Sequence, residues 1–125
     1  MRLLLDTHVL LWLMAGSQRL KPKTRALIDS ASEVYVSSVS IWEIAVKYRV
    51  GKIEEDPEEI VERLEEAGLR ELPVLTRHAV AAGKLPLLHR DPFDRLLVGQ
   101  AITEPMRLLT ADPQLAAYSE LVITI

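Results

Sequence analysis

The first twelve residues constrain the fold of this chain more than any other stretch. The run Leu3-Leu4-Leu5 is apolar, ends at the carboxylate of Asp6 and is followed at once by apolar residues at helical spacing. This order predicts a buried strand that leads directly into a helix. In open α/β sheets ligands bind beyond the carboxyl ends of the strands, so Asp6 is a candidate site residue. Asp also caps helices, but Thr7 is available for that task, and we favour the site for Asp6.

Short strands and helices alternate along the whole chain. The residue pattern predicts strands at about 3–5, 34–36, 69–74, 107–110 and 121–125, and helices at about 8–15, 22–32, 39–49, 57–67, 76–82, 92–102 and 113–118. This alternation is typical of a parallel sheet with helices on both faces. Pro73 places the third strand at a sheet edge, because proline has no N–H to donate to a second neighbour. We expect one domain over residues 1–125, an α/β fold with three α/β/α layers and about five parallel strands.

Composition and charge narrow the possible functions. Among the 125 residues there is no cysteine, so no disulfide, thiol nucleophile or thiolate zinc site is available. No stretch is long enough to span a membrane, and Asp6 interrupts the apolar core that a signal peptide needs, which predicts a cytoplasmic protein with no membrane partner. Because the net charge is −3, a phosphate-bearing partner must be held by a local basic patch or by a bound cation.

Four carboxylates are predicted to meet at one edge of the sheet. Asp6 and Asp112 each follow a strand and precede a helix, Asp94 lies in the first turn of a helix, and Glu43 follows the second strand by a few residues. In a parallel sheet all connections from strand to helix emerge on the same side. The four acids can therefore converge on one crevice.

Helix capping is a second explanation for each of these acids, since helix starts favour Asp and Glu. The run Ser40-Ile41-Trp42-Glu43 fits a capping box, in which Glu43 bonds the backbone N–H of Ser40. Asp91 before Pro92 fits an N-cap, which leaves Asp94 free for the site. Asp112 before Pro113 fits a cap and a site equally well.

The conjunction of the four acids favours a metal site. Unpaired carboxylates in one cleft repel one another unless a cation neutralises them. The candidate ligands are all hard oxygens, and there is no histidine pair at zinc spacing. Such a set selects Mg²⁺ or Mn²⁺ over zinc or copper. A site with few protein ligands leaves positions open for water and phosphate oxygens.

Four motifs in order give the chain a resemblance to a known family: Leu3-Leu4-Leu5-Asp6-Thr7-His8, Ser38-Val39-Ser40-Ile41-Trp42-Glu43-Ile44-Ala45, Asp91-Pro92-Phe93-Asp94-Arg95-Leu96-Leu97 and Leu109-Thr110-Ala111-Asp112. Over essentially its whole length the chain resembles PIN-domain proteins, and most of all the VapC-type ribonuclease toxins of type II toxin–antitoxin pairs. The resemblance implies a PIN-like sandwich in which Asp6, Glu43, Asp94 and Asp112 bind Mg²⁺. It also implies RNA hydrolysis, a homodimer, and a cognate antitoxin along a helical arm at about 44–64.

On this basis we expect a Mg²⁺-dependent endoribonuclease, with Mn²⁺ able to substitute, in which the metal activates water for attack on a phosphodiester. Three further residues are candidates for auxiliary roles. Thr7 and Thr110 can hydrogen-bond a ligand carboxylate or a metal-bound water, although a buried cap is the safer interpretation for either. Asp91 is assigned to capping. Arg90, Arg95 and Lys84 can contact RNA or balance the acids. A further group of basic residues lies at the start of the second helix: Arg19, Lys21, Lys23 and Arg25. These side chains form either a solvated face or a phosphate contact, and we favour the solvated face.

Other functions remain in competition. His78 and His89 could catalyse cleavage without metal, which chelation would separate from a metal mechanism. A receiver-like signalling domain lacks the Asp and Lys that it would need, and a catalytically silent PIN-fold module that binds RNA or protein is the main alternative. Aromatic residues at helical spacing are expected in the core more often than at partner contacts: Trp12, Trp42 and Tyr48. Gly99 stands where the family resemblance predicts alanine, which puts the packing of that helix in question.

Overall fold

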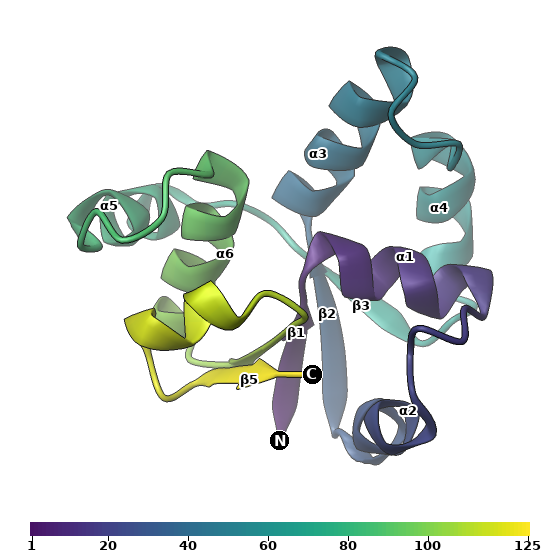
Figure 1. Ribbon diagram of the computed structural model, residues 1–125, viewed down its shortest axis with the longest axis horizontal. Coiled ribbons are helices and arrows are strands. Elements are labelled where there is room, and N and C mark those ends of the chain that lie inside the picture. The colour runs from purple at the N-terminus through teal and green to yellow at the C-terminus, as the bar shows by residue number, and fades with distance from the viewer.

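The computed structural model describes residues 1–125 and contains the predicted alternation of strands and helices (Figure 1). The elements in chain order are β1 (Arg2–Leu5), α1 (Thr7–Ala15), α2 (Pro22–Ser30), β2 (Glu33–Ser37), α3 (Ser38–Arg49), α4 (Pro57–Leu64), β3 (Leu69–Leu72), α5 (Thr76–Lys84), α6 (Pro92–Thr103), β4 (Arg107–Thr110), the 3-10 helix η1 (Pro113–Tyr118) and β5 (Val122–Thr124). Four elements end earlier than predicted: α2 ends at Ser30, α4 at Leu64, β3 before Pro73 and β5 at Thr124.

The five strands form one parallel sheet in the order β3-β2-β1-β4-β5. The three-layer α/β prediction is confirmed, and β3 lies at the sheet edge as Pro73 indicated. Strand β1 is central, and the chain crosses from it to β2 on one side and later to β4 on the other. Ligands of open α/β sheets bind where the strand order reverses in this way. The carboxyl end of β1 is therefore the expected site of function.

The sheet has an apolar core on each face. Along β1, Leu3 and Leu5 pack into one core with α1, α2, α3 and α4, while Leu4 packs into the other with α6 and η1. All three leucines are fully buried. Because successive side chains of a strand point to opposite faces, a continuous apolar run is needed where both faces are covered. This explains the uninterrupted leucine run that precedes Asp6.

Helix α5 approaches α6 closely at Gly99. A Cβ atom built on Gly99 would lie 2.8 Å from the backbone nitrogen of Ala82 in α5. An alanine at this position would clash with the backbone. Glycine in place of the expected alanine therefore does not disturb the packing of α6, because it permits the contact between these two helices.

Several aromatic residues expected in the core are exposed. Trp42 is 63% exposed and Tyr48 is 43% exposed, so the core prediction is wrong for both. Trp12 is partly buried against the first core. Trp42 and Tyr48 belong to α3, which together with α4 extends from the body of the molecule (Figure 1). Across the whole chain, no helix has the length and apolar character required to cross a membrane.

Candidate metal centre

Asp6 divides its two carboxylate oxygens between two partners. It directly follows β1, and Oδ1 accepts a hydrogen bond of 2.9 Å from the backbone N–H of Val9, which makes Asp6 the N-cap of α1. Oδ2 accepts a hydrogen bond from the hydroxyl of Thr110 at the end of β4. The expectation that Thr7 could replace Asp6 as the cap is wrong. Asp6 therefore caps α1 and also belongs to the acid cluster.

Glu43 reaches the same region from α3. The capping-box interpretation is wrong, because the helix is capped by Ser37 and Ser40 lies inside its first turns. The carboxylate of Glu43 instead accepts hydrogen bonds of 2.6 Å from the hydroxyl of Thr7 and 2.6 Å from Nζ of Lys47. Glu43 is only 3% exposed. The helix therefore places a buried carboxylate beside the start of α1.

The two threonines predicted as auxiliary residues both bind cluster carboxylates. Thr110 donates to Asp6, and Thr7 donates to Glu43. Thr7 is not a cap, so the capping interpretation preferred for it is wrong. The hydroxyl of Thr110 also accepts a hydrogen bond of 3.0 Å from the backbone N–H of Asp112, so Thr110 caps the turn after β4, although the N-cap of η1 is Asp112. Both hydroxyls are buried and hold the carboxylates in place.

Asp94 and Asp112 face each other across His89. Asp91 is the N-cap of α6, as predicted, and its carboxylate accepts from the N–H groups of Phe93 and Asp94. Oδ2 of Asp94 lies 2.9 Å from Nε2 of His89, and Oδ2 of Asp112 lies 3.7 Å from the same nitrogen. Asp112 also caps η1 through Oδ1. Each of these two acids thus keeps one oxygen near His89.

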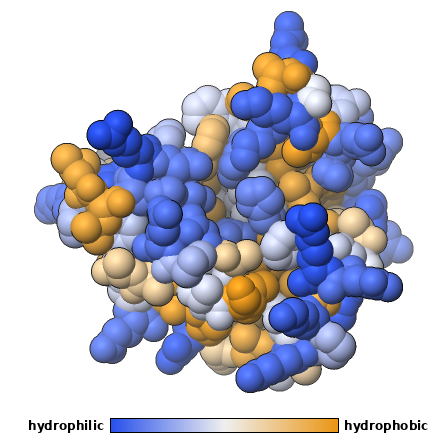
Figure 2. Space-filling view, in the orientation of Figure 1, coloured by the Kyte–Doolittle hydropathy of each residue, from blue (hydrophilic) through white to orange (hydrophobic).

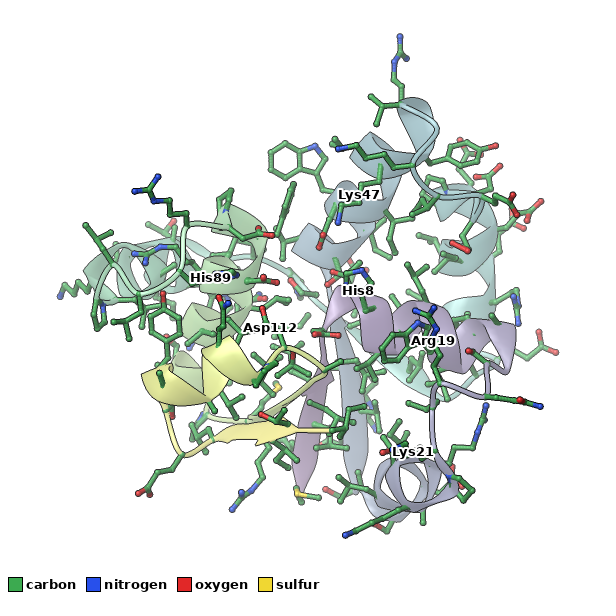
Figure 3. All side chains as sticks on the ribbon, viewed as in Figure 1. His8, Arg19, Lys21, Lys47, His89 and Asp112 are labelled. Carbon is green, nitrogen blue, oxygen red and sulfur yellow. The ribbon has the colours of Figure 1, made fainter.

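All four predicted carboxylates line one cavity of about 470 Å³, and hydrophilic side chains cover most of this face of the molecule (Figure 2). Figure 3 shows His89 and Asp112 on one side of this region and His8, Arg19 and Lys47 on the other. The cavity is lined by Asp6, His8, Trp12, Arg19, Glu43, Lys47, His89, Asp91, Asp94, Ala111 and Asp112.

The acids of the cavity perturb one another. Burial raises the pKa of Asp6. Burial and, to a lesser extent, the negative charges of Asp91, Glu43 and Asp6 together raise the pKa of Asp94 to about 6, against the opposing hydrogen bond from His89. Removal of a carboxylate from water and the approach of like charges both disfavour its ionised form. The cluster is thus an electrostatically unfavourable arrangement that a cation would relieve.

The donors, four carboxylates and one imidazole, fit a divalent cation, and three of them are spaced to bind one ion. One ligand atom each from His89, Asp94 and Asp112 lies within 4.8 Å of the others, a spacing that one ion can bridge. Asp6 and Glu43 complete the lining with buried carboxylates that are held by threonine hydroxyls. Hydrogen bonds of this kind orient metal ligands in proteins.

Sequence reasoning missed two residues of the centre. Lys47 pairs with Glu43 and partly compensates its charge, and the spacing of four residues on a predicted helix was a usable signal. His89 was considered only as a catalytic base in a pair with His78. The prediction that His78 and His89 act as a catalytic pair is wrong, because His78 is fully buried and its ring nitrogens are bonded to the Leu75 N–H and the Glu104 carboxylate. His89 comes from the segment between α5 and α6, which has no periodic pattern to place it.

The three basic residues predicted to contact RNA differ in their surroundings. The guanidinium of Arg95 donates to the backbone oxygens of Pro86, Ala82 and Leu85, so it holds the segment between α5 and α6 in place. Its donors are engaged by the fold. Lys84 and Arg90 are exposed, and their contact with RNA stays a prediction.

Known proteins share both the sequence pattern and the fold. Residues 3–121 match the family model described as PIN domain. Ribonuclease VapC22 of Mycobacterium tuberculosis is 31% identical, with 92% of this chain and 90% of that protein covered. The fold is similar to a toxin–antitoxin complex from Klebsiella pneumoniae, with a TM-score of 0.70, 19% identity and 97% and 95% of the two chains covered. It is also similar to VapBC2 of Rickettsia felis bound to a promoter DNA fragment, with a TM-score of 0.69, 18% identity and 100% and 98% covered. The chain therefore belongs to the PIN domain family.

Proposed function

We propose that this protein is a Mg²⁺-dependent endoribonuclease that hydrolyses RNA phosphodiesters, with Mn²⁺ as a substitute ion. The observation that carries the proposal is the cavity in which Asp6, Glu43, Asp94 and Asp112 come together, with the charges of Glu43 and Asp6 raising the pKa of Asp94. The relative VapC22, named as a ribonuclease, supports the same activity. Substrate RNA would enter the open side of this cavity.

The four carboxylates would hold the ion. A bound divalent ion supplies water activation at neutral pH and neutralises phosphodiester charge. Thr110 and Thr7 fix the orientation of the Asp6 and Glu43 carboxylates, and Asp91 fixes the start of the helix that carries Asp94. Lys47 limits the net negative charge that an approaching phosphate meets. No nucleophilic side chain is required, since water is the attacking group.

We also propose that the protein is the toxin of a toxin–antitoxin pair. The structural neighbours are described as toxin–antitoxin complexes, which supports this role. Helices α3 and α4 and the segment that joins them expose apolar side chains that a helix or strand of an antitoxin could cover: Trp42, Val46, Tyr48, Val50 and Val61. Large exposed apolar groups are typical of protein contact sites. A homodimer is part of the same proposal.

Cleavage of RNA in the presence and absence of metal tests the activity. We expect Mg²⁺-dependent production of new RNA ends, loss of activity in EDTA, and recovery with Mn²⁺. Asp6→Asn should abolish cleavage with the fold intact by circular dichroism. Asp29→Asn, which removes an exposed acid of α2 outside the cavity, should retain full activity. Cleavage that survives chelation, or that persists in Asp6→Asn, would exclude the metal mechanism.

RNA binding without turnover in the presence of Mg²⁺ would instead favour the catalytically silent module. Co-expression with a candidate antitoxin, followed by purification through a tag on one partner, tests the antitoxin proposal. We expect the pair to purify together and the RNA cleavage to be suppressed. Val46→Asp should weaken the association, because it places a charge in the exposed apolar surface of α3.

A further inference from the structure

A groove leads out of the acid cavity towards α2. Trp12, Arg19 and Ala111 line the acid cavity and also a second cavity of about 140 Å³. Lys21 and Thr24 line that second cavity and also a third of about 690 Å³ between α2 and the end of β5. Because consecutive cavities share wall residues, the three lie next to one another in a row that leads from the acids to α2. We call this row the α2 groove.

The α2 groove carries positive charge that no carboxylate side chain neutralises. The side chains of Arg19, Lys21 and Lys23 are exposed and form no ion pair and no hydrogen bond. No acidic side chain lines the second or the third cavity. By contrast, Lys47, which also lines the acid cavity, is engaged with Glu43. In a chain with a net charge of −3, this is a local basic patch beside an acidic centre.

Trp12 gives the groove a second property. The guanidinium carbon of Arg19 lies 6.0 Å from the centre of the Trp12 ring, within the range of a cation–π contact. Figure 3 shows Arg19 beside α1 and Lys21 below it, beside α2. Single-stranded nucleic acids are bound by this combination of cations along a path and an aromatic surface.

We propose that the α2 groove binds the backbone of single-stranded RNA on one side of the cleaved phosphodiester. Arg19 and Lys21 each neutralise one phosphate, and Lys23 extends the path. This inference rests on the proposed ribonuclease function, because a strand whose phosphodiester lies at the four carboxylates must leave the cavity along an open wall. The groove resolves the conflict between an acidic centre and a polyanionic substrate, since attraction is supplied next to the acids.

The salt dependence of RNA binding tests the proposal. Every protein carries Asp112→Asn to prevent turnover, and the probe is a fluorescein-labelled single-stranded RNA of mixed sequence and about 12 nucleotides in constant Mg²⁺. Anisotropy titrations at increasing NaCl give the slope of log K against log salt. This slope is negative, and loss of one phosphate contact makes it shallower by about 0.7 for a single strand. We expect Arg19→Gln/Lys21→Gln to make it shallower by about 1.4 and to weaken binding at low salt.

The matched control is Arg49→Gln/Lys52→Gln, which also removes two exposed cations. Arg49 is the last residue of α3 and Lys52 follows that helix, so neither lines a cavity of the α2 groove. The slope of this control should equal that of the parent. Equal slopes for the parent and Arg19→Gln/Lys21→Gln, or an equal loss in the control, would overturn the proposal while leaving the ribonuclease function intact. If Arg19→Gln/Lys21→Gln leaves the slope unchanged but weakens binding of a co-expressed antitoxin, the proposal is overturned as well. The α2 groove would then be a binding site for a protein. A parent that binds no RNA would contradict both the groove and the ribonuclease.

Discussion

The oxygens of Asp6 show how one residue serves the fold and the site together. One oxygen caps the N-terminus of α1 by accepting from the N–H of Val9, and the other is held by Thr110 of the neighbouring strand β4. Asp112 likewise caps η1 while its second oxygen faces His89. A cap fixes the position of a carboxylate without using all its lone pairs. Capping therefore contributes to the preorganisation of the proposed metal ligands.

Thr110→Val tests this preorganisation. The substitution keeps the side-chain volume but removes the hydroxyl that donates to Asp6, so the carboxylate loses its orientation and its charge loses a partner. Loss of such a contact typically lowers metal affinity 10- to 100-fold. We expect a decrease of this size in Mn²⁺ affinity measured by electron paramagnetic resonance. Thr103→Val, which removes a hydroxyl bonded to a backbone oxygen of α6, is the control and should bind Mn²⁺ as the parent does.

The raised pKa of Asp94 predicts how the metal-free protein responds to pH. Its pKa is about 6 in the folded state against 3.8 for an ordinary Asp, so between these values the folded state binds more protons than the unfolded state. Stability must then fall as pH rises from about 4 to about 6. The full shift corresponds to about 3 kcal/mol, which solvent screening at the partly exposed side chain reduces to roughly 1–2 kcal/mol.

Urea unfolding in EDTA at pH 5 and pH 7 measures this effect. We expect the parent to lose stability between the two pH values and Asp94→Asn to lose less, so that the variant is the more stable protein at pH 7. Asp29→Asn should follow the parent. A variant that shows the full pH dependence of the parent would contradict the assignment of this titration to Asp94.

At the scale of elements, the close packing of α5 against α6 depends on the absence of a side chain at Gly99. Gly99→Ala would improve the helix propensity of α6 by up to about 1 kcal/mol, yet its Cβ would meet the backbone of Ala82 at 2.8 Å. Backbone cannot move aside as a side chain can, and overpacking costs about 1–3 kcal/mol. We expect a net loss of stability in thermal unfolding. Gly83→Ala in α5, where nothing lies within 4 Å, should be neutral or stabilising.

Most elements were predictable because their signals are local. The leucine run of β1 and the Asp91-Pro92 start of α6 each specify an element through nearby residues. The capping box at Ser40 failed because the strand β2 runs directly into α3, so that Ser37 is the cap and no loop separates the two elements. The exposure of Trp42 was also missed, since helical spacing alone does not say which face of α3 is covered.

At the scale of the whole molecule, the strand order creates the site. The sequence predicts parallel strands but not their order, which depends on contacts between distant segments. With β1 between β2 and β4, the residues that follow these three strands reach the same crevice. His89 enters it from a segment that is held by Arg95, a tertiary contact with no periodic signal. The acids could be named from sequence, whereas their neighbours required the fold.

The same convergence predicts that the stability of the whole domain is linked to metal. Ions that bind only the folded state stabilise it by about 2.7 kcal/mol at a hundred times their dissociation constant, or roughly 10 °C in Tm for a domain of this size. Mg²⁺ should produce such a rise at pH 7.5 and a smaller one at pH 5, because protonation of Asp94, with its pKa of about 6, competes with the ion. Asp6→Asn/Asp112→Asn should abolish the rise at both pH values. A rise in Tm that is equal in the parent and in this double variant would mean that Mg²⁺ acts on the general surface of the protein and that the four carboxylates do not bind it.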